Sequence, residues 1–277
     1  MPWASPKALI GMVHLRALPG SPSSALTIGE IACKAAGEAR ILAEAGFDAV
    51  MIENMHDRPY VHGRQGPEVV AAMTAAGIAV RQELARVGLG SVPLGVQVLS
   101  GGSREALAVA LACGGSFVRV ENFVFAHVAD EGLLERAEAG PLLRYRRVIG
   151  AEHIRVLCDV KKKHASHAIT ADVTIAEAAQ AAAFFGADGV IVTGPATGRP
   201  AEASDVAAVR GAVALPVLVG SGVTPETVEA LFEHADALIV GSACKQDGVW
   251  CNELDHARVA ALARAAERAR GATGGGA

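Results

Sequence analysis

Short apolar segments alternate with longer amphipathic segments along this chain, and the pair occurs eight times. The apolar segments are almost uninterrupted, which is typical of strands buried on both faces of a parallel sheet. Between two of them, residues 28–45 place Ile28, Ile31, Ala35 and Leu42 on one helical face. The predicted strands are residues 9–15, 49–55, 94–99, 117–123, 154–160, 189–194, 216–222 and 237–243. Eight strand–helix units predict an α/β protein built as one (β/α)₈ barrel, the TIM-barrel fold.

The length and composition agree with a single domain. A chain of 277 residues suits one barrel, and 51% hydrophobic residues are sufficient for its core. We expect the barrel to occupy residues 1–270 and the glycine-rich residues 271–277 to form a flexible tail. Asp255 should cap the last helix, and Thr224, followed by Pro225, should cap the helix before it.

The loops that follow the predicted strands are longer than those that precede them. Gly46 and Asp48, like Gly186 and Asp188, fit the short turn between a helix and the next strand. The long loops are residues 16–26, 56–66, 124–140, 161–173, 195–203 and 244–254. Barrel enzymes build their sites from the loops at the carboxyl ends of the strands, so we expect the functional site at that end.

The last two predicted strands both end in glycine and serine. Gly220, Ser221 and Gly222 end the seventh, and Gly241 and Ser242 end the eighth. Because these strands are neighbours in a barrel, their backbone amides can converge on one anion, and a serine hydroxyl adds a donor. We predict a phosphate-binding site here. The alternative is that the glycines serve only the tight turns after the strands.

Polar residues gather at the carboxyl ends of the other strands. We predict catalytic roles for His14, Glu53, Asn54, Asp159 and Lys161. We predict substrate contacts for Gln97, Arg119, Glu121, Lys163, His164, Thr193 and Gly194. Since an unpaired charge inside a barrel is costly, these groups must pair with one another or face a polar mouth. A structural salt-bridge network that includes Arg119 and Glu121 is the alternative.

Three consecutive lysines follow the fifth strand. Lys161 is suited to a Schiff base, to proton transfer or to holding a substrate phosphate. Asp159 beside it would raise its pKa, which disfavours the Schiff base and favours electrostatic stabilisation or proton transfer. Lys162 and Lys163 are expected to be solvated or to close over the ligand.

The cysteine and histidine spacing matches no zinc site, and the five cysteines form no C-x-x-C pair. No cofactor is firmly implied. Glu53, His56 and Asp57 lie close together in the sequence, so a magnesium ion held with a substrate phosphate is one alternative.

The formal net charge of −4 argues against nucleic acid as a partner. No stretch offers the roughly 20 unbroken apolar residues of a transmembrane helix. We expect a cytoplasmic protein with a small phosphorylated ligand. Peripheral membrane association and a homo-oligomer both remain compatible with the sequence.

Taken together, the motifs resemble the BtpA/SgcQ family over nearly the whole chain. The residues that carry this resemblance are IGMVHLRALPGSP (10–22), AVMIENMHDRPY (49–60), FVRVENF (117–123), DVKKKHASHAI (159–169), GVIVTGPATG (189–198), VLVGSGVTPE (217–226) and IVGSACKQDGVWCNELD (239–255). The resemblance implies a barrel. It also implies either a phosphorylated carbohydrate substrate, as the sugar-operon branch suggests, or a role in photosystem I biogenesis at a membrane, after which the family is named.

These observations favour an enzyme that acts on a small phosphorylated metabolite by lyase, aldolase or isomerase chemistry. Late-strand amides would hold the phosphate, while Glu53 or His14 would move a proton. The first alternative is an assembly factor without catalysis, and the second is a metal-dependent hydrolase.

Overall fold

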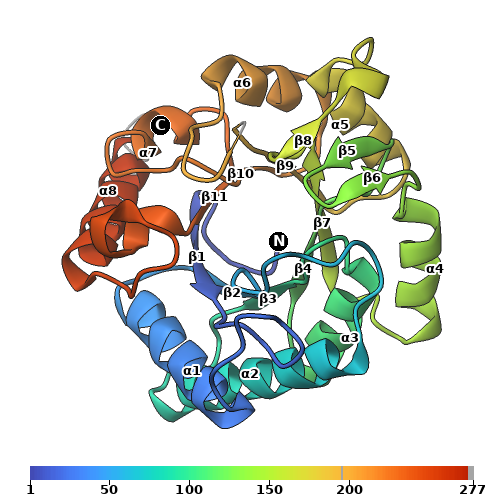
Figure 1. The fold of residues 1–277 in the computed structure, drawn as a ribbon. Coiled ribbons are helices and arrows are strands. Elements are labelled where there is room, and N and C mark those ends of the chain that lie inside the picture. The colour runs from blue at the N-terminus through green and yellow to red at the C-terminus, as the bar shows by residue number, and fades with distance from the viewer. Residues whose placement is uncertain (195, 274–277) are drawn as a thin grey trace.

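A closed barrel of eight parallel strands forms the centre of the molecule (Figure 1). The computed structural model describes residues 1–194 and 196–273. Around the barrel the strands follow the order β1-β11-β10-β9-β7-β4-β3-β2, so the predicted fold is confirmed. The strands are β1 (Ala8–His14), β2 (Ala49–Glu53), β3 (Leu94–Gln97), β4 (Phe117–Val120), β7 (Arg155–Val160), β9 (Gly189–Val192), β10 (Val217–Val219) and β11 (Ala237–Val240). All eight coincide with predicted strands, although several end two or three residues early.

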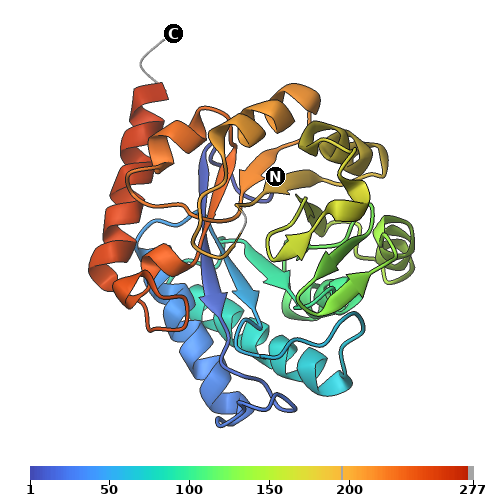
Figure 2. The same cartoon turned by 45° about the horizontal axis from the view of Figure 1, so that its top comes forward.

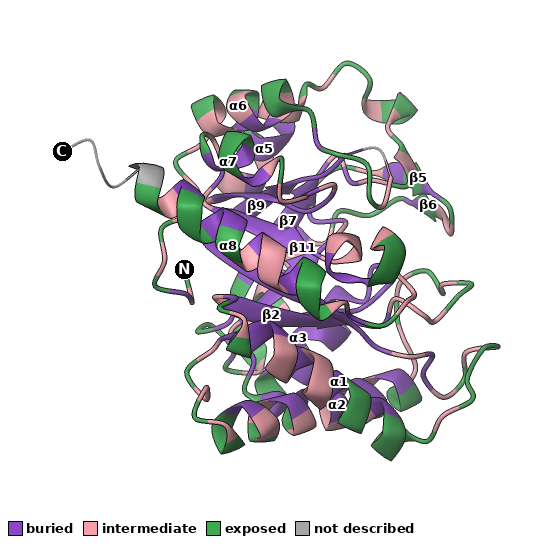
Figure 3. Ribbon diagram, turned by 90° about the vertical axis from the view of Figure 1, so that its left-hand side faces the viewer, coloured by how far each residue is buried: buried purple, intermediate pink, exposed green. Residues whose placement is uncertain are grey.

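Helices cover the outside of the barrel. They are α1 (Ile28–Glu44), α2 (Pro67–Arg86), α3 (Ser103–Cys113), α4 (Ala139–Val148), α5 (Ile175–Phe184), α6 (Ala203–Ala212), α7 (Val228–Phe232) and α8 (His256–Thr273). α8 lies between α7 and α1, which closes the outer ring (Figures 1 and 2). The strands are buried, while the helices expose their outer faces (Figure 3). None of the helices in the described residues is long and apolar enough to cross a lipid bilayer.

Two predicted helix boundaries need correction. α7 begins at Val228, because Thr224 instead donates its N–H to Thr227 Oγ1 in a turn that precedes the helix. Asp255 does cap α8, since its carboxylate accepts the N–H of Ala257. This helix continues to Thr273, so the first three residues of the predicted tail are helical, and 274–277 lie outside the described residues.

Strand alternation divides the barrel interior into an apolar base and a polar top. Inward-facing side chains at the base form one buried cluster: Ile10, Met12, Met51, Phe117, Leu157, Ile191, Leu218 and Ile239. Trp3 closes the base edge-on against Phe117, at 5.5 Å between ring centroids. Because a side chain keeps its direction every second residue, the same series continues upward. It reaches His14, Glu53, Gln97, Arg119, Asp159, Thr193, Gly220 and Gly241.

The loops after β4 and β7, which we predicted as irregular, join in a small antiparallel sheet. Its strands are β5 (His127–Ala129), β6 (Gly132–Leu134) and β8 (Ala165–Ser166), in the order β6-β5-β8. β5 and β6 lie at the opposite end of the molecule from the N-terminus (Figure 3). Hydrogen bonding between two long loops therefore orders one side of the barrel mouth.

Candidate functional site at the carboxyl end of the barrel

Two adjoining cavities occupy the carboxyl end of the barrel. The first has a volume of about 170 Å³ and lies over the ends of β1, β10 and β11. The second, about 250 Å³, extends toward β3, β4 and the loop after β7. Glu53, Met55, Lys163 and Thr197 line both cavities. One ligand can therefore extend from the first cavity into the second.

The first cavity is lined by residues whose backbone amides have no acceptor in the part of the protein that the structure describes, and we call these amides the amide cradle. It consists of the N–H groups of Ser221, Gly222 and Val223 after β10, and of Gly241, Ser242 and Ala243 after β11. Within residues 1–194 and 196–273, these six groups donate to no protein acceptor. A set of backbone donors around one hollow is a general device for binding an anion.

The local backbone of the cradle requires glycine at two positions. Gly222 has φ +68°, and a Cβ there would lie 2.1 Å from Cα of Pro200. A Cβ on Gly241 would lie 3.0 Å from Cε1 of His14. These close approaches to other parts of the protein favour glycine at both positions, while the predicted approach to a phosphate stays a prediction.

We predicted that the Ser221 hydroxyl donates to a phosphate, but in the structure this hydroxyl binds two backbone groups. It accepts the N–H of Gly194 at 2.6 Å and donates to the carbonyl of Arg199 at 3.0 Å. The hydroxyl therefore connects β10 to the loop after β9, and Gly194, predicted to contact substrate, uses its N–H in this connection. Ser221 can offer an anion only its backbone N–H.

A histidine and a glutamate face each other at the ends of β1 and β2. His14 and Glu53 are paired in register, and Nε2 of His14 lies 3.6 Å from Oε2 of Glu53. Nδ1 of His14 is 3.1 Å from the carbonyl of Trp250. Since a carbonyl only accepts, Nδ1 carries the proton and Nε2 presents a lone pair toward Glu53.

The buried surroundings give these two groups opposite pKa shifts. Burial lowers the pKa of His14 to about 3, with a further contribution from Lys245, so the imidazole is neutral at ordinary pH. Burial also raises the pKa of Glu53, and the positive charges of Arg119 and Lys163 only partly oppose this. Nε2 of His14 and the carboxyl of Glu53 are therefore neighbouring groups, one a proton acceptor and the other of raised pKa, that could exchange a proton with a ligand.

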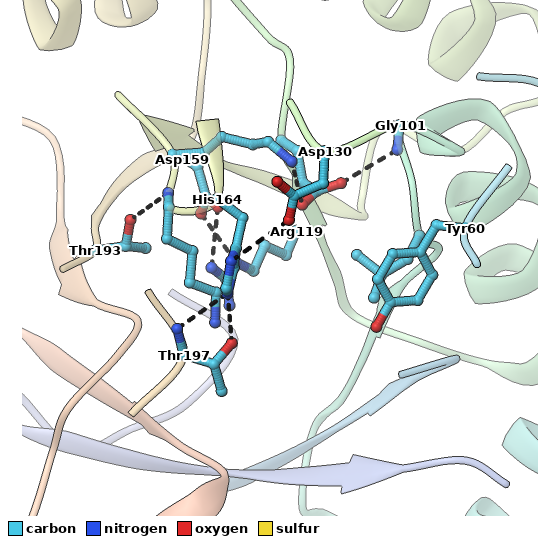
Figure 4. A network of polar contacts seen from close by, with 12 residues as sticks. Tyr60, Gly101, Arg119, Asp130, Asp159, His164, Thr193 and Thr197 are labelled. Atoms are coloured by element: carbon cyan, nitrogen blue, oxygen red, sulfur yellow. Dashed lines mark hydrogen bonds and ion pairs between the residues drawn. The ribbon is translucent and has the colours of Figure 1, made fainter. Parts of the chain in front are cut away.

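Arg119 and Asp159 form a buried two-pronged ion pair. Nε and Nη2 of Arg119 lie 2.9 Å from Oδ1 and Oδ2 of Asp159 (Figure 4). Both side chains are almost fully buried. Glu121 pairs instead with Lys162, at 3.2 Å. The predicted salt-bridge network therefore exists with different partners, and Asp159, predicted to act in catalysis, is fully used by Arg119.

The three lysines after β7 point to different places. Lys161, predicted to be catalytic, lines a small separate cavity near Val173 and Ala178, outside the main cavities. Its φ of +48° ends the strand alternation that would have directed it inward. Lys162, predicted to be solvated, is buried against Glu121. Lys163 is the lysine that reaches both cavities, and burial together with Arg119 lowers its pKa.

Asn54 has a structural role, contrary to our prediction. Its amide accepts the N–H of Leu99 at 2.7 Å and donates to the carbonyl of the same residue at 3.1 Å. Asn54 comes one residue after Glu53 and therefore points to the other side of the strand. It holds the end of β3 in place and lines neither cavity.

The predicted magnesium ligands do not form a common site. Asp57 accepts the N–H of Leu18 at 2.6 Å and the amide of Asn54 at 3.0 Å. His56 packs against Trp250, with 4.9 Å between ring centroids, while Glu53 faces His14. In the part of the chain that the structure describes, no three His, Cys, Asp or Glu side chains gather as a metal site.

Of the remaining predicted contacts, Gln97 and His164 line the second cavity, and Thr193 lines neither main cavity. Gln97 is buried, and within the described residues its Oε1 has no hydrogen-bond partner. Thr193 accepts the N–H of Lys163 through its hydroxyl at 2.9 Å (Figure 4). Nε2 of His164 accepts the N–H of Thr197 at 3.0 Å (Figure 4). Thr193 and His164 therefore position backbone, whereas Gln97 keeps an acceptor available to a ligand.

Known proteins resemble this chain along nearly its whole length. A model of the BtpA family matches residues 5–268. The chain belongs to the BtpA family. An uncharacterized mitochondrial protein of Caenorhabditis elegans is 43% identical over 254 residues, which cover 91% of this chain and 90% of that protein. The photosystem I biogenesis protein BtpA of Synechocystis is 35% identical over 258 residues, covering 93% and 87%.

Solved structures share the fold of this BtpA-family protein at low sequence identity. Thiamine phosphate pyrophosphorylase from Pyrococcus furiosus has a TM-score of 0.60 and 14% identity, with 95% of this chain and 96% of that chain covered. (S)-3-O-geranylgeranylglyceryl phosphate synthase from Thermoplasma acidophilum, in complex with sn-glycerol-1-phosphate, has a TM-score of 0.58 and 17% identity, with 95% and 94% covered. These similarities establish the barrel architecture.

Trp250 is a site residue that our sequence analysis missed. Its carbonyl fixes the tautomer of His14, and its ring packs on His56 and beneath the guanidinium of Arg58, 4.7 Å from the ring centroid. It also lines the second cavity of this BtpA-family protein. One signal in the sequence could have identified it: a tryptophan in a long loop of a chain in which only 4% of the residues are aromatic.

The buried neutral His14 predicts a specific pH dependence of stability. Its folded pKa is about 3 and its ordinary value 6.5, so the unfolded chain takes up the proton first as the pH falls. Stability is therefore lost from about pH 6.5 downward. Protonation of His14 in the unfolded chain should lower the free energy of unfolding by about 2 kcal/mol between pH 7 and pH 5. In His14→Gln the decrease between these pH values should be smaller than in the parent by that amount. Urea unfolding at both pH values measures this.

Two comparisons make that experiment decisive. Glu53, whose pKa is raised, acts in the opposite direction, so only the difference between parent and variant isolates His14. His153→Gln, at an exposed position, should keep the pH dependence of the parent. An unchanged pH dependence in His14→Gln would contradict the buried neutral histidine.

Proposed function

We propose that this BtpA-family protein is an enzyme that acts on a small phosphorylated metabolite at the carboxyl end of its barrel. The observation that carries the proposal is the amide cradle. The six residues that carry these unpaired N–H groups come from two adjacent strand ends and line one cavity, and Arg258 adds positive charge to its lining. A phosphate presents several strong acceptor oxygens and a negative charge, so it satisfies such donors better than a neutral group does.

The chemistry would take place where the two cavities meet. Glu53 lines both, and His14 lines the first. With the phosphate in the cradle, the rest of a short metabolite extends over these two residues. Glu53 would donate a proton to a developing oxyanion while Nε2 of His14 removes one from carbon, which is the proton transfer of an isomerase, lyase or aldolase.

The fold comparison supports this proposal by analogy. Two similar structures are named as enzymes of phosphorylated compounds, and one of them was solved with sn-glycerol-1-phosphate. Their sequence identity to this chain is below 20%, so the argument for activity rests on the cradle and the acid–base pair.

Ligand-induced thermal stabilisation tests the cradle. Inorganic phosphate or a sugar phosphate at 100 times its Kd should stabilise the fold by about 2.7 kcal/mol, which corresponds to a rise in Tm of about 5 °C or more for a domain of this size. Ser242→Asp places a carboxylate beside the cradle amides and should abolish the shift through charge repulsion. Differential scanning fluorimetry measures both.

The matched control carries the same substitution at the other end of the barrel. Ser91 is exposed just before β3, so Ser91→Asp should retain the full shift. The proposal fails if no phosphorylated compound raises the Tm, or if Ser242→Asp responds like the parent.

An assembly role is the alternative suggested by the name of the Synechocystis relative. It needs an exposed binding surface, and Val148 at the end of α4 and Phe184 at the end of α5 are strongly exposed apolar residues. Such a role would not require the buried acid–base pair or the unpaired amides. Buried ionisable groups and unpaired amides destabilise a fold unless a ligand binds them. We therefore prefer the enzyme to the assembly factor.

A further inference from the structure

The side-chain nitrogen of Lys163, unlike that of the preceding Lys162, has no close counter-ion in the described part of the chain. Among the described residues, no carboxylate oxygen lies within 4.0 Å of its Nζ, whereas Lys162 is paired with Glu121 at 3.2 Å. Lys163 nevertheless lines both cavities, together with Glu53. A lysine in such a place gains little from ionic pairing, so its presence calls for another explanation.

The backbone on both sides of Lys163 is held firmly. The N–H of Lys163 donates to Thr193 Oγ1 at 2.9 Å. The side chain of the preceding Lys162 pairs with Glu121, and the ring of the following His164 accepts the N–H of Thr197. These three attachments fix where the Lys163 side chain begins, as expected of a residue that must meet a substrate atom.

We propose that Lys163 is the nucleophile that captures the carbonyl carbon of a phosphorylated aldehyde or ketone as an imine. The inference rests on the proposed function, because the amide cradle supplies the anchor for the phosphate. Lys163 and Glu53 both line the two cavities. A carbonyl a few bonds from the phosphate would lie within reach of Lys163.

The covalent step is balanced by the groups present. The neutral amine adds to the carbonyl carbon, and the carbonyl oxygen takes a proton from the carboxyl of Glu53, whose pKa is raised by burial. The added nitrogen then gives one of its protons to the same oxygen, which leaves as water, and a protonated imine remains on Nζ while Glu53 is left as the carboxylate. The positive nitrogen then accepts electrons when His14 Nε2 removes a proton from the adjacent carbon, and hydrolysis restores the amine.

The electrostatic surroundings of Lys163 shift its pKa in the direction that favours the free amine. Burial lowers its pKa, and Arg119 lowers it further, although Glu53, Asp159 and Glu121 oppose the shift. Arg258 already supplies a positive charge to the lining of the first cavity. A second cation is therefore not needed for phosphate binding alone, while a free amine is needed for imine formation.

Borohydride trapping tests this proposal directly. The full-length protein is incubated with glyceraldehyde 3-phosphate or dihydroxyacetone phosphate, reduced with sodium borohydride, digested and mapped by mass spectrometry. We expect a secondary-amine adduct at Lys163 in clear excess over Lys161, since Lys163 lines both main cavities and Lys161 lines neither. Lys163→Arg should lose the adduct, while Lys161→Arg should label like the parent.

Thermal shift with inorganic phosphate separates this inference from the proposed function. If Lys163→Arg keeps the thermal shift with phosphate and loses the adduct, the proposed function and the imine are both supported. If the parent shows the phosphate shift but neither probe labels Lys163 above Lys161, the imine is overturned and the phosphate site survives. If the parent shows no shift with phosphate or with either probe, the proposed function and the imine fall together.

Discussion

Replacing Glu53 by glutamine should lower the rate of proton transfer on a bound sugar phosphate by about 100- to 10,000-fold, the usual contribution of a positioned general acid or base. Glutamine keeps the size of the side chain but removes the carboxyl proton. The loss should appear in kcat, because Glu53 is not part of the amide cradle. Exchange of a carbon-bound hydrogen of dihydroxyacetone phosphate with deuterated water, followed by NMR, measures it.

The matched control for this variant is another partly buried carboxyl. The pKa of Glu138 is also raised by burial, yet the residue precedes α4 and lines neither main cavity. Glu138→Gln should exchange hydrogen at the parent rate. Glu53→Gln should retain the thermal shift with inorganic phosphate, which shows that the fold and the cradle are intact. Parent-like exchange in Glu53→Gln would remove this residue from the mechanism.

Arg119→Met should destabilise the fold by about 3–5 kcal/mol, because it leaves the carboxylate of Asp159 buried without its counter-ion. Arg119 and Asp159 are 3% and 1% exposed, so water cannot replace the lost partner. The double variant Arg119→Met with Asp159→Leu should recover much of the loss, since it removes both charges. Urea unfolding followed by circular dichroism measures all three proteins.

A surface pair provides the comparison. Arg147 and Glu152 form an exposed ion pair, and Arg147→Met should cost less than about 1 kcal/mol. A similarly small effect in Arg119→Met, or no recovery in the double variant, would show that the stability of the barrel does not depend on pairing these two buried charges.

The two ion pairs and the acid–base pair have distinct positions in the barrel mouth. Arg119 reaches across the interior, since a Cβ on Gly220 would lie 3.2 Å from its Nη2. It therefore forms part of the floor of the first cavity, while Lys162 and Glu121 order the side under β5 and β8. Glu53 and Lys163 line both cavities and take part in neither of these two ion pairs, so they remain available to a ligand.

The eight strands, the barrel and the glycine-serine ends of β10 and β11 could all be predicted from the sequence. Local signals were sufficient because buried parallel strands require continuous apolar segments and close backbone approach requires glycine. The inward-facing residues His14, Glu53 and Gln97 followed from the same logic. Their side-chain direction depends only on the period of two along a strand, which local sequence determines.

Only the tertiary structure decided which of these polar residues remain available for chemistry. The carboxylate of Asp159 is bound by Arg119 from the neighbouring strand. The amide of Asn54 is bound by the backbone of Leu99, forty-five residues away in the sequence. The change at Lys161 from strand to positive φ directed Lys163, and not Lys161, into the mouth. Pairing partners and loop directions depend on contacts between distant segments, and strand periodicity contains no information about them.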